Sequence, residues 1–258
     1  MHFFQSADTS IAYKTIGTHD ADKPVIIWAH GWGQSHASFL PLITPLERSG
    51  HHITLDLPGF GQSPAPSEEW GTRDYADAIA AWIKEQGYTN IIWVGHSFGC
   101  RVGVQLAAHH PNLLTGLCLV AGAGLKRKRP LHKKIYFYCR IKLFKALRRF
   151  VPDGQFKDAL MTKFGSSDYN NAGPMRKIFV RVVNEDLTPE AQNITCPTTL
   201  IYGSNDTETP PEFGQRYSRL IKGSKLHLLD GQDHYSVLGN GRHPVVKILK
   251  DFIGNICT

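Results

Sequence analysis

The chain contains several short runs of apolar and β-branched residues that no charged residue interrupts. The four clearest runs are residues 25–29, 91–94, 117–121 and 198–202. Continuous runs of this length are typical of strands buried on both faces of a parallel sheet. Two weaker runs, residues 53–55 and 226–229, predict two further strands, and residues 3–4 and 11–13 predict antiparallel strands at the start of the chain.

Helical stretches separate these predicted strands. The clearest are residues 72–86, 98–110, 212–221 and 244–253, and Gly87 is placed to end the first of them. Strands that alternate with helices in this way favour a mostly parallel, twisted α/β sheet with helices on both of its faces. A length of 258 residues suits one large domain of this kind.

One segment breaks the alternation. Residues 124–193 contain no strand-like run, show a helical pattern and are punctuated by prolines and glycines. We interpret this segment as a helical cap (lid) inserted between two strands of the main sheet. The predicted core domain therefore comprises residues 1–123 and 194–258.

Composition excludes several classes of protein. Hydrophobic residues make up 41% of the chain and charged residues 20%, which is an ordinary globular composition. No apolar run reaches the roughly 18 residues of a membrane-spanning helix, and residues 1–5 do not begin a signal peptide, so a cytoplasmic location is expected. The five cysteines are widely spaced and odd in number, so we expect neither a disulfide framework nor a zinc site.

The net charge of +7 belongs to one segment. Eleven of the 29 lysines and arginines lie between Gly124 and Phe150, where there is no acidic residue, so the remainder carries 18 bases against 22 acids. Within this basic segment, residues 126–149, an apolar helix face is predicted by the spacing of Phe137, Ile141, Phe144 and Leu147.

Three interpretations of the basic segment remain open. In the first, the apolar face of the helix packs on the core and the basic face is exposed to solvent. In the second, the basic side chains attract anionic substrates. In the third, they bind an anionic membrane surface. No recognised nucleic-acid-binding module is present, so we expect no nucleic-acid partner. The expected partner is a small-molecule ester, and the chain is expected to be a monomer or homodimer.

The strongest chemical signal is Gly95-His96-Ser97-Phe98-Gly99, between a predicted strand and a predicted helix. A serine on such a sharp turn has a strained backbone and an exposed hydroxyl, and the flanking glycines prevent collisions with neighbouring backbone. A free serine hydroxyl is a weak nucleophile and needs a base to take its proton. Ser97 is therefore the predicted nucleophile.

A second glycine-containing motif, His30-Gly31-Trp32-Gly33, follows the strand at 25–29. Its backbone amides can turn toward the nucleophile. We predict that the N–H groups of Trp32 and Phe98 form an oxyanion hole, which stabilises the charge that develops on a substrate carbonyl.

Two further loops follow predicted strands and supply an acid and a base. Asp206 lies after residues 198–202, and His234 lies after residues 226–229. Glu208 and Asp230 are rival acids. Asp233 is a poor partner for His234 because adjacent side chains rarely point at each other. We therefore predict that Asp206 orients His234, which acts as general base.

The chain order serine, aspartate, histidine is that of the α/β-hydrolase fold. On these motifs the chain resembles the α/β-hydrolase superfamily over nearly its whole length, and in particular its capped, single-domain serine hydrolases of carboxylesterase type. Residues 56–63, Asp-Leu-Pro-Gly-Phe-Gly-Gln-Ser, resemble a segment common in those proteins. The resemblance agrees with the roles assigned to Ser97, Asp206 and His234.

Enzymes of this fold that use an aspartate nucleophile, such as epoxide hydrolases and haloalkane dehalogenases, are disfavoured because position 97 is serine. An ester hydrolase that forms an acyl-enzyme is the favoured function, without a metal or an organic cofactor. A carbon–carbon bond hydrolase and a ligand-binding receptor that keeps the triad remain alternatives. The candidate substrate-binding residues are all aromatic: Trp32, Phe98, Tyr136, Tyr138, Phe144 and Tyr235.

Overall fold

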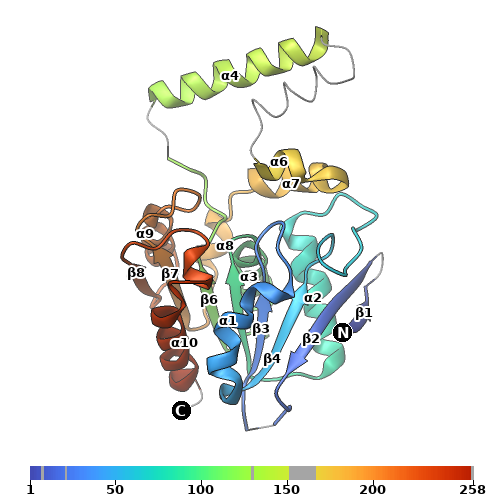
Figure 1. The fold of residues 1–258 in the computed structure, drawn as a ribbon, viewed down its shortest axis with the longest axis vertical. Helices are drawn as coiled ribbons and strands as arrows, with labels where there is room; N and C mark the ends of the chain where they lie inside the picture. The colour runs from blue at the N-terminus through green and yellow to red at the C-terminus, as the bar shows by residue number, and fades with distance from the viewer. Residues whose placement is uncertain (7–8, 21, 129–130, 151–166, 257–258) are drawn as a thin grey trace.

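The computed structural model describes residues 1–6, 9–20, 22–128, 131–150 and 167–256, and its centre is an eight-stranded sheet (Figure 1). The strands are β1 (His2–Gln5), β2 (Ser10–Ile16), β3 (Val25–Ala29), β4 (His51–Asp56), β5 (Ile91–His96), β6 (Gly116–Val120), β7 (Thr198–Gly203) and β8 (Lys225–Leu229). Their order in the sheet is β1-β2-β4-β3-β5-β6-β7-β8. Strand β2 is antiparallel to both neighbours, and all pairs from β4 to β8 are parallel.

Helices cover both faces of the sheet. On one face, side chains of α2 (Thr72–Gln86), α3 (Phe98–His109) and α9 (Pro211–Leu220) share a buried cluster with the strands. On the other, α1 (Leu40–Ile43) and α10 (Arg242–Ile256) do the same. The predicted α/β sheet with helices on both faces is therefore confirmed.

Residues 36–49 form short helices that the sequence pattern did not indicate. They are η1 (His36–Phe39), α1 and η2 (Thr44–Ser49). Prolines lie in the first turn of both α1 and η2, and each element spans six residues or fewer. Elements of four to six residues span fewer than two α-helical turns, so apolar positions cannot recur often enough for periodicity to find them.

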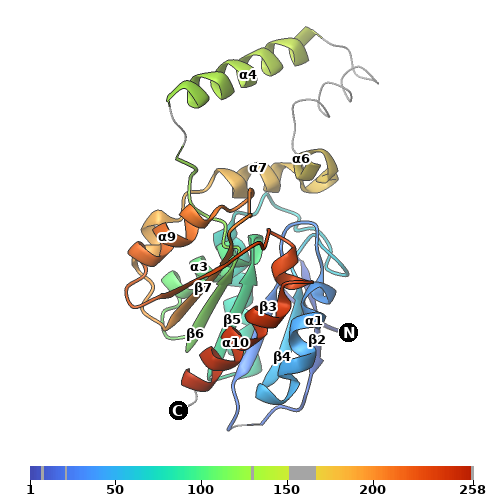
Figure 2. The ribbon, with the colours of Figure 1, turned by 60° about the vertical axis from the view of Figure 1, so that its left-hand side comes forward.

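The described residues between β6 and β7 form helices and no strand. These helices are α4 (Leu131–Phe150), α6 (Ser167–Asn171), η3 (Gly173–Met175), α7 (Arg176–Asn184) and α8 (Thr188–Gln192). Helices α6 and α7 lie next to the sheet, and α4 stands farther out in both views (Figures 1 and 2). Helix α8 contacts α3 and α9 of the core. The cap limits of 124 and 193 stay a prediction, and residues 151–166 lie outside the described chain.

Helix α4 exposes apolar side chains. Ile141 is 53% exposed and Phe144 is half-buried, while the side chains of Phe137 and Leu147 lie outside the described set. Ile141 therefore does not pack on the core as one interpretation of the basic segment expected. In the described part of the chain, no helix has the length and apolar character needed to cross a membrane.

The loop after β4 is organised by one buried carboxylate, that of Asp56. Its Oδ1 accepts hydrogen bonds from the backbone N–H of His36 at 2.7 Å and from His36 Nδ1 at 3.0 Å, and its Oδ2 accepts one from the N–H of Gln62 at 2.9 Å. Gly61 has a φ of +57°, and a Cβ atom there would collide with this carboxyl group. Burial opposes ionisation, but the hydrogen bonds outweigh it and hold the pKa of Asp56 below its usual value.

We expect Asp56→Asn to lower the free energy of unfolding by about 2 kcal/mol at pH 7, because hydrogen bonds to a charged acceptor are worth about 1.5–3 kcal/mol. A lowered pKa stabilises the folded protein above the usual carboxyl pKa of about 4, and this stability is lost as the pH falls through the lowered value. Urea unfolding of both proteins at pH 7, 4 and 3 checks this. A difference that is the same at pH 3 and pH 7 would contradict it.

Candidate active site

Ser97 lies on a tight turn between β5 and α3. Its φ of +48° and ψ of −101° are sterically unfavourable for a residue with a Cβ atom, and such strain is concentrated at functional sites. The turn needs glycine on both sides. A Cβ on Gly95 would lie 2.6 Å from the backbone of Gly99, and one on Gly99 would collide with the backbone of Ala29.

The backbone N–H groups of Trp32 and Phe98 have no protein acceptor among the described contacts. The amides on either side of Phe98 are both used, because Ser97 N–H donates to the carbonyl of Val120 and Gly99 N–H donates to the carbonyl of His30, each at 3.1 Å. The predicted oxyanion-hole donors are therefore available to a ligand.

His30 holds the Trp32 loop in place. Burial lowers the pKa of His30 to about 4, so its ring is neutral at pH 7. From its contacts, Nδ1–H donates to the carbonyl of Gly31 at 2.7 Å, and Nε2 accepts from the N–H of Leu57 at 3.0 Å. This ring therefore links the loop after β3 to the loop after β4.

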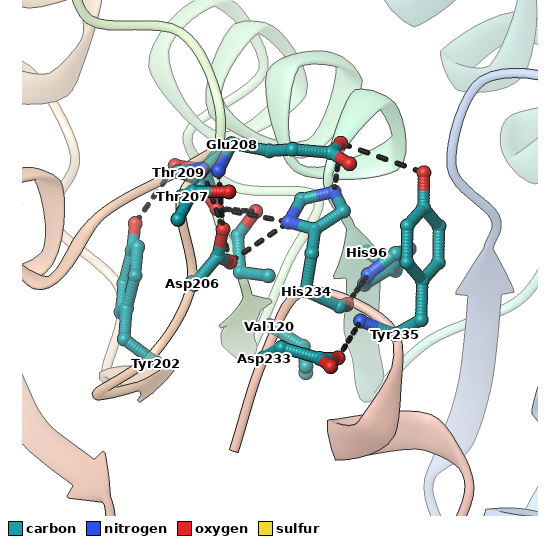
Figure 3. A network of polar contacts seen from close by, with 12 residues as sticks. His96, Val120, Tyr202, Asp206, Thr207, Glu208, Thr209, Asp233, His234 and Tyr235 are labelled. Atoms are coloured by element: carbon teal, nitrogen blue, oxygen red, sulfur yellow. Dashed lines mark hydrogen bonds and ion pairs between the residues drawn. The ribbon is translucent and has the colours of Figure 1, made fainter. Parts of the chain in front are cut away.

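His234 and Asp206 form a buried pair (Figure 3). His234 Nδ1 lies 2.8 Å from Asp206 Oδ2, and Asp206 Oδ1 accepts the N–H groups of Glu208 and Thr209, each at 2.8 Å. Burial raises the pKa of Asp206, but the bonds from His234 and Thr209 outweigh it, and the pKa lies below its usual value. A charged carboxylate at this place fixes the Nδ1–H tautomer of the imidazole.

The other ring nitrogen of His234 faces a second carboxylate. Glu208 Oε2 lies 3.5 Å from His234 Nε2 and 3.4 Å from the hydroxyl of Tyr235 (Figure 3). Among the described contacts, the Ser97 hydroxyl makes no hydrogen bond with His234. Catalytic hydrogen bonds are often long without substrate and shorten when substrate binds.

The remaining rival acids have other partners. Asp233 accepts hydrogen bonds from the N–H groups of Tyr235 at 2.9 Å and Ser236 at 2.8 Å, which makes it part of a turn. Asp230 accepts a hydrogen bond from the hydroxyl of Ser204.

His96 supports the His234 loop, a role that sequence reasoning missed. It is fully buried, and burial lowers its pKa to about 3. Its Nε2 lies 2.9 Å from the carbonyl oxygen of His234, and its Nδ1 lies 3.2 Å from Oε1 of Gln34, which also accepts the N–H of Gly31. The only sequence signal was its place beside Ser97.

An aromatic cluster lies beside the available amides. The ring of Trp32 is 4.8 Å from that of Phe60, 5.4 Å from that of Phe98 and 5.0 Å from that of Phe179. Sequence reasoning named Trp32 and Phe98 but missed the other two. Phe60 was visible inside the 56–63 motif, whereas Phe179 on α7 had no distinguishing signal.

Of the other predicted substrate-binding aromatic residues, one lies beside His234 and three lie on α4. Tyr235 adjoins His234, with their rings 5.1 Å apart. The structure does not bring Tyr136 and Tyr138 to the site, because both are about 60% exposed on α4, which stands away from the sheet. Phe144 also lies on α4. Periodicity placed these residues on a helix but could not place that helix relative to the core.

Comparisons with known proteins show which proteins this chain resembles. A sequence profile described as the alpha/beta hydrolase fold matches residues 24–138. Pimeloyl-(acyl-carrier protein) methyl ester esterase from Neisseria meningitidis serogroup C is 26% identical over 92% of this chain and 96% of its own length. YugF, an uncharacterised hydrolase of Bacillus subtilis, is 27% identical over 90% of each chain.

Solved structures share the architecture. An esterase from Exiguobacterium antarcticum has a TM-score of 0.74 at 20% identity and covers 98% of both chains. A bacterial membrane phospholipase A has a TM-score of 0.77 at 23% identity and covers 99% of this chain and 86% of its own. The molecule has the α/β-hydrolase fold. The profile match and these relatives support the α/β-hydrolase superfamily, and the names of the relatives support a hydrolase.

Proposed function

We propose that this protein is a serine esterase, in which Ser97, His234 and Asp206 act as nucleophile, general base and orienting acid. The observation that carries the proposal is the buried His234–Asp206 pair, whose hydrogen bond leaves Nε2 as the ring nitrogen that accepts a proton. The strained backbone of Ser97 and the two available amides support it further.

In the proposed reaction, Ser97 Oγ attacks the ester carbonyl as His234 Nε2 takes the hydroxyl proton. The carbonyl oxygen becomes an oxyanion, which accepts hydrogen bonds from the N–H groups of Trp32 and Phe98. His234 returns the proton to the departing alcohol, and an acyl group remains on Ser97. A water molecule activated by His234 then releases the acid, while Asp206 stabilises the imidazolium.

The aromatic cluster favours an apolar acyl group. Four aromatic rings lie beside the proposed oxyanion hole, those of Trp32, Phe60, Phe98 and Phe179. The alkyl part of a small or medium-sized ester would be removed from water by packing against them, which is favourable. No metal or organic cofactor takes part in this scheme. In the described part of the chain, no group of metal-ligating side chains is assembled.

The purified protein is expected to hydrolyse 4-nitrophenyl esters with many turnovers. A series from acetate to a long acyl chain would give the length that the site accepts. Diethyl 4-nitrophenyl phosphate, which phosphorylates activated serines, should stop turnover and leave one diethylphosphate on the peptide that contains Ser97, as mass spectrometry would show. Inhibition with the adduct on another peptide would refute Ser97 as the nucleophile. Absence of turnover on every ester would count against an esterase.

A further inference from the structure

A pocket of about 630 Å³ adjoins the His234–Asp206 pair. Two of its lining residues also contact that pair. Glu208 faces His234, and the Thr209 hydroxyl donates a hydrogen bond to Asp206 at 2.8 Å. Phe179, which packs on Trp32, lines it from α7. Its position and volume suit part of a small substrate that reacts at Ser97.

Arg101 lines this pocket one helical turn after Ser97. The residue is only 9% exposed, and its Nη1 has no hydrogen-bond partner among the residues that the structure describes. Buried guanidinium groups normally have their N–H groups satisfied, because an unpartnered buried charge is costly. Burial accordingly lowers the pKa of Arg101.

The acids nearest to Arg101 have other partners. Glu185 accepts hydrogen bonds from the backbone N–H and the hydroxyl of Thr72, and Asp186 accepts them from Thr188. Both carboxylates act on Arg101 through space, without an ion pair in the described contacts. Nη1 is therefore a buried donor without an acceptor among the described residues.

Two more cations line the same pocket, Lys126 and Arg127. The Arg127 guanidinium donates to the carbonyl oxygens of Thr207 and Glu208, which carry no net charge and so leave its positive charge uncompensated. Asp186 lies near Lys126 and offsets part of its charge. Among the described lining residues, Glu208 is the only acid. The lining is therefore net positive.

We propose that this pocket binds a carboxylate carried by the substrate, with Arg101 as its buried anchor. The inference rests on the proposed esterase function and narrows its substrate to a negatively charged ester. A carboxylate offers two oxygens to the fork of a guanidinium, and such charge-assisted bonds are stronger than neutral ones. The substrate carboxylate would supply the acceptor that Arg101 Nη1 lacks.

Matched pairs of esters test the pocket. For a charge on the acyl part, mono-4-nitrophenyl adipate is compared with 4-nitrophenyl hexanoate. For a charge on the alcohol part, 4-acetoxybenzoate is compared with 4-acetoxybenzamide. In one of the two pairs, we expect kcat/KM for the anionic ester to exceed that for the neutral ester by about tenfold or more. The pair that shows this preference tells whether the substrate carries its charge on the acyl part or on the alcohol part. Equal values within both pairs would overturn the proposal and leave the esterase function standing.

Variants assign the preference to residues. Arg101→Gln is expected to lower the anionic-to-neutral ratio of kcat/KM by about 10-fold to 100-fold, the range for one charge-assisted hydrogen bond, and Arg101→Lys should recover part of it. Lys126→Gln removes an exposed charge from the pocket and should lower the ratio several-fold without disturbing the core. Arg219→Gln removes an exposed charge of α9 outside the pocket and should leave the ratio unchanged. Equal ratios in all four variants and the wild type would overturn the assignment.

A binding measurement separates this proposal from the reaction. Calorimetry of Ser97→Ala with monomethyl adipate, which is anionic, and with methyl hexanoate, which is neutral, needs no turnover. Tighter binding of monomethyl adipate that Lys126→Gln weakens would support the pocket. If no ester is hydrolysed but monomethyl adipate binds in this way, the esterase proposal fails and the anion site stands. If monomethyl adipate binds no better than methyl hexanoate and 4-hydroxybenzoate no better than 4-hydroxybenzamide, the anion site fails.

Discussion

Ser97→Ala is expected to lower kcat on 4-nitrophenyl esters by about 10⁴-fold to 10⁶-fold, the range seen when a catalytic serine is removed. Alanine keeps the backbone of the turn but offers no oxygen to attack the carbonyl. The amides of Trp32 and Phe98 remain, so a small residual rate above that in water is expected. Stopped assays with concentrated enzyme would measure it.

Two controls make this result specific. Ser218→Ala removes a half-buried hydroxyl of α9 outside the site and should keep the wild-type rate. Thermal unfolding of Ser97→Ala should resemble that of the wild type, because the Ser97 hydroxyl has no hydrogen bond to lose in the described contacts. A Ser97→Ala protein that retains wild-type kcat would exclude Ser97 as the nucleophile.

Asp206→Asn is expected to lower kcat by about 10³-fold to 10⁴-fold, in line with the same change in other triads. The structure explains why. Oδ1 accepts the N–H groups of Glu208 and Thr209, so the asparagine oxygen must take that position and its NH₂ group must face His234 Nδ1. A donor there forces the proton of the neutral imidazole onto Nε2, which then cannot accept the proton of Ser97.

The matched control is the second carboxylate beside the same histidine. Glu208→Gln changes a half-exposed side chain 3.5 Å from Nε2, and we expect kcat to stay within about tenfold of the wild-type value. Steady-state kinetics of the two variants at pH 8 would compare them. A loss in Glu208→Gln larger than that in Asp206→Asn would exchange the roles assigned to the two acids.

The strands were predictable because each carries its own signal. Residues 25–29 match β3 to the residue, and β5 and β7 begin where their apolar runs begin. The order of the strands was not predictable in the same way. Strand β4 lies between β2 and β3, although β3 precedes it in the chain. Pairing partners depend on contacts between distant segments, which no local run records.

In the candidate site, too, the features with a local sequence signal were predictable and the contacts between distant segments were not. Ser97 was predictable because the strand, the turn and the glycines that it needs are all within a few residues. Asp206 and His234 were predicted as loop residues after strands. Asp206 was preferred to Glu208, Asp230 and Asp233, but the sequence does not show which side chain contacts His234. The structure brings Asp206 to Nδ1 and Glu208 to Nε2 of the same ring.

By itself, the sequence determined the α/β class, the position of most strands and the strained serine turn, because these depend on residues close together in the chain. Only the tertiary structure decided which acid meets His234, that Phe60 and Phe179 join Trp32, and that α4 keeps its tyrosines away from the site. It also decided that Arg101 is buried with an N–H group that has no partner in the described part of the chain, although in the sequence it resembles any helix cation. Burial and pairing are set by segments far apart in the chain, so they exist only once those segments have packed.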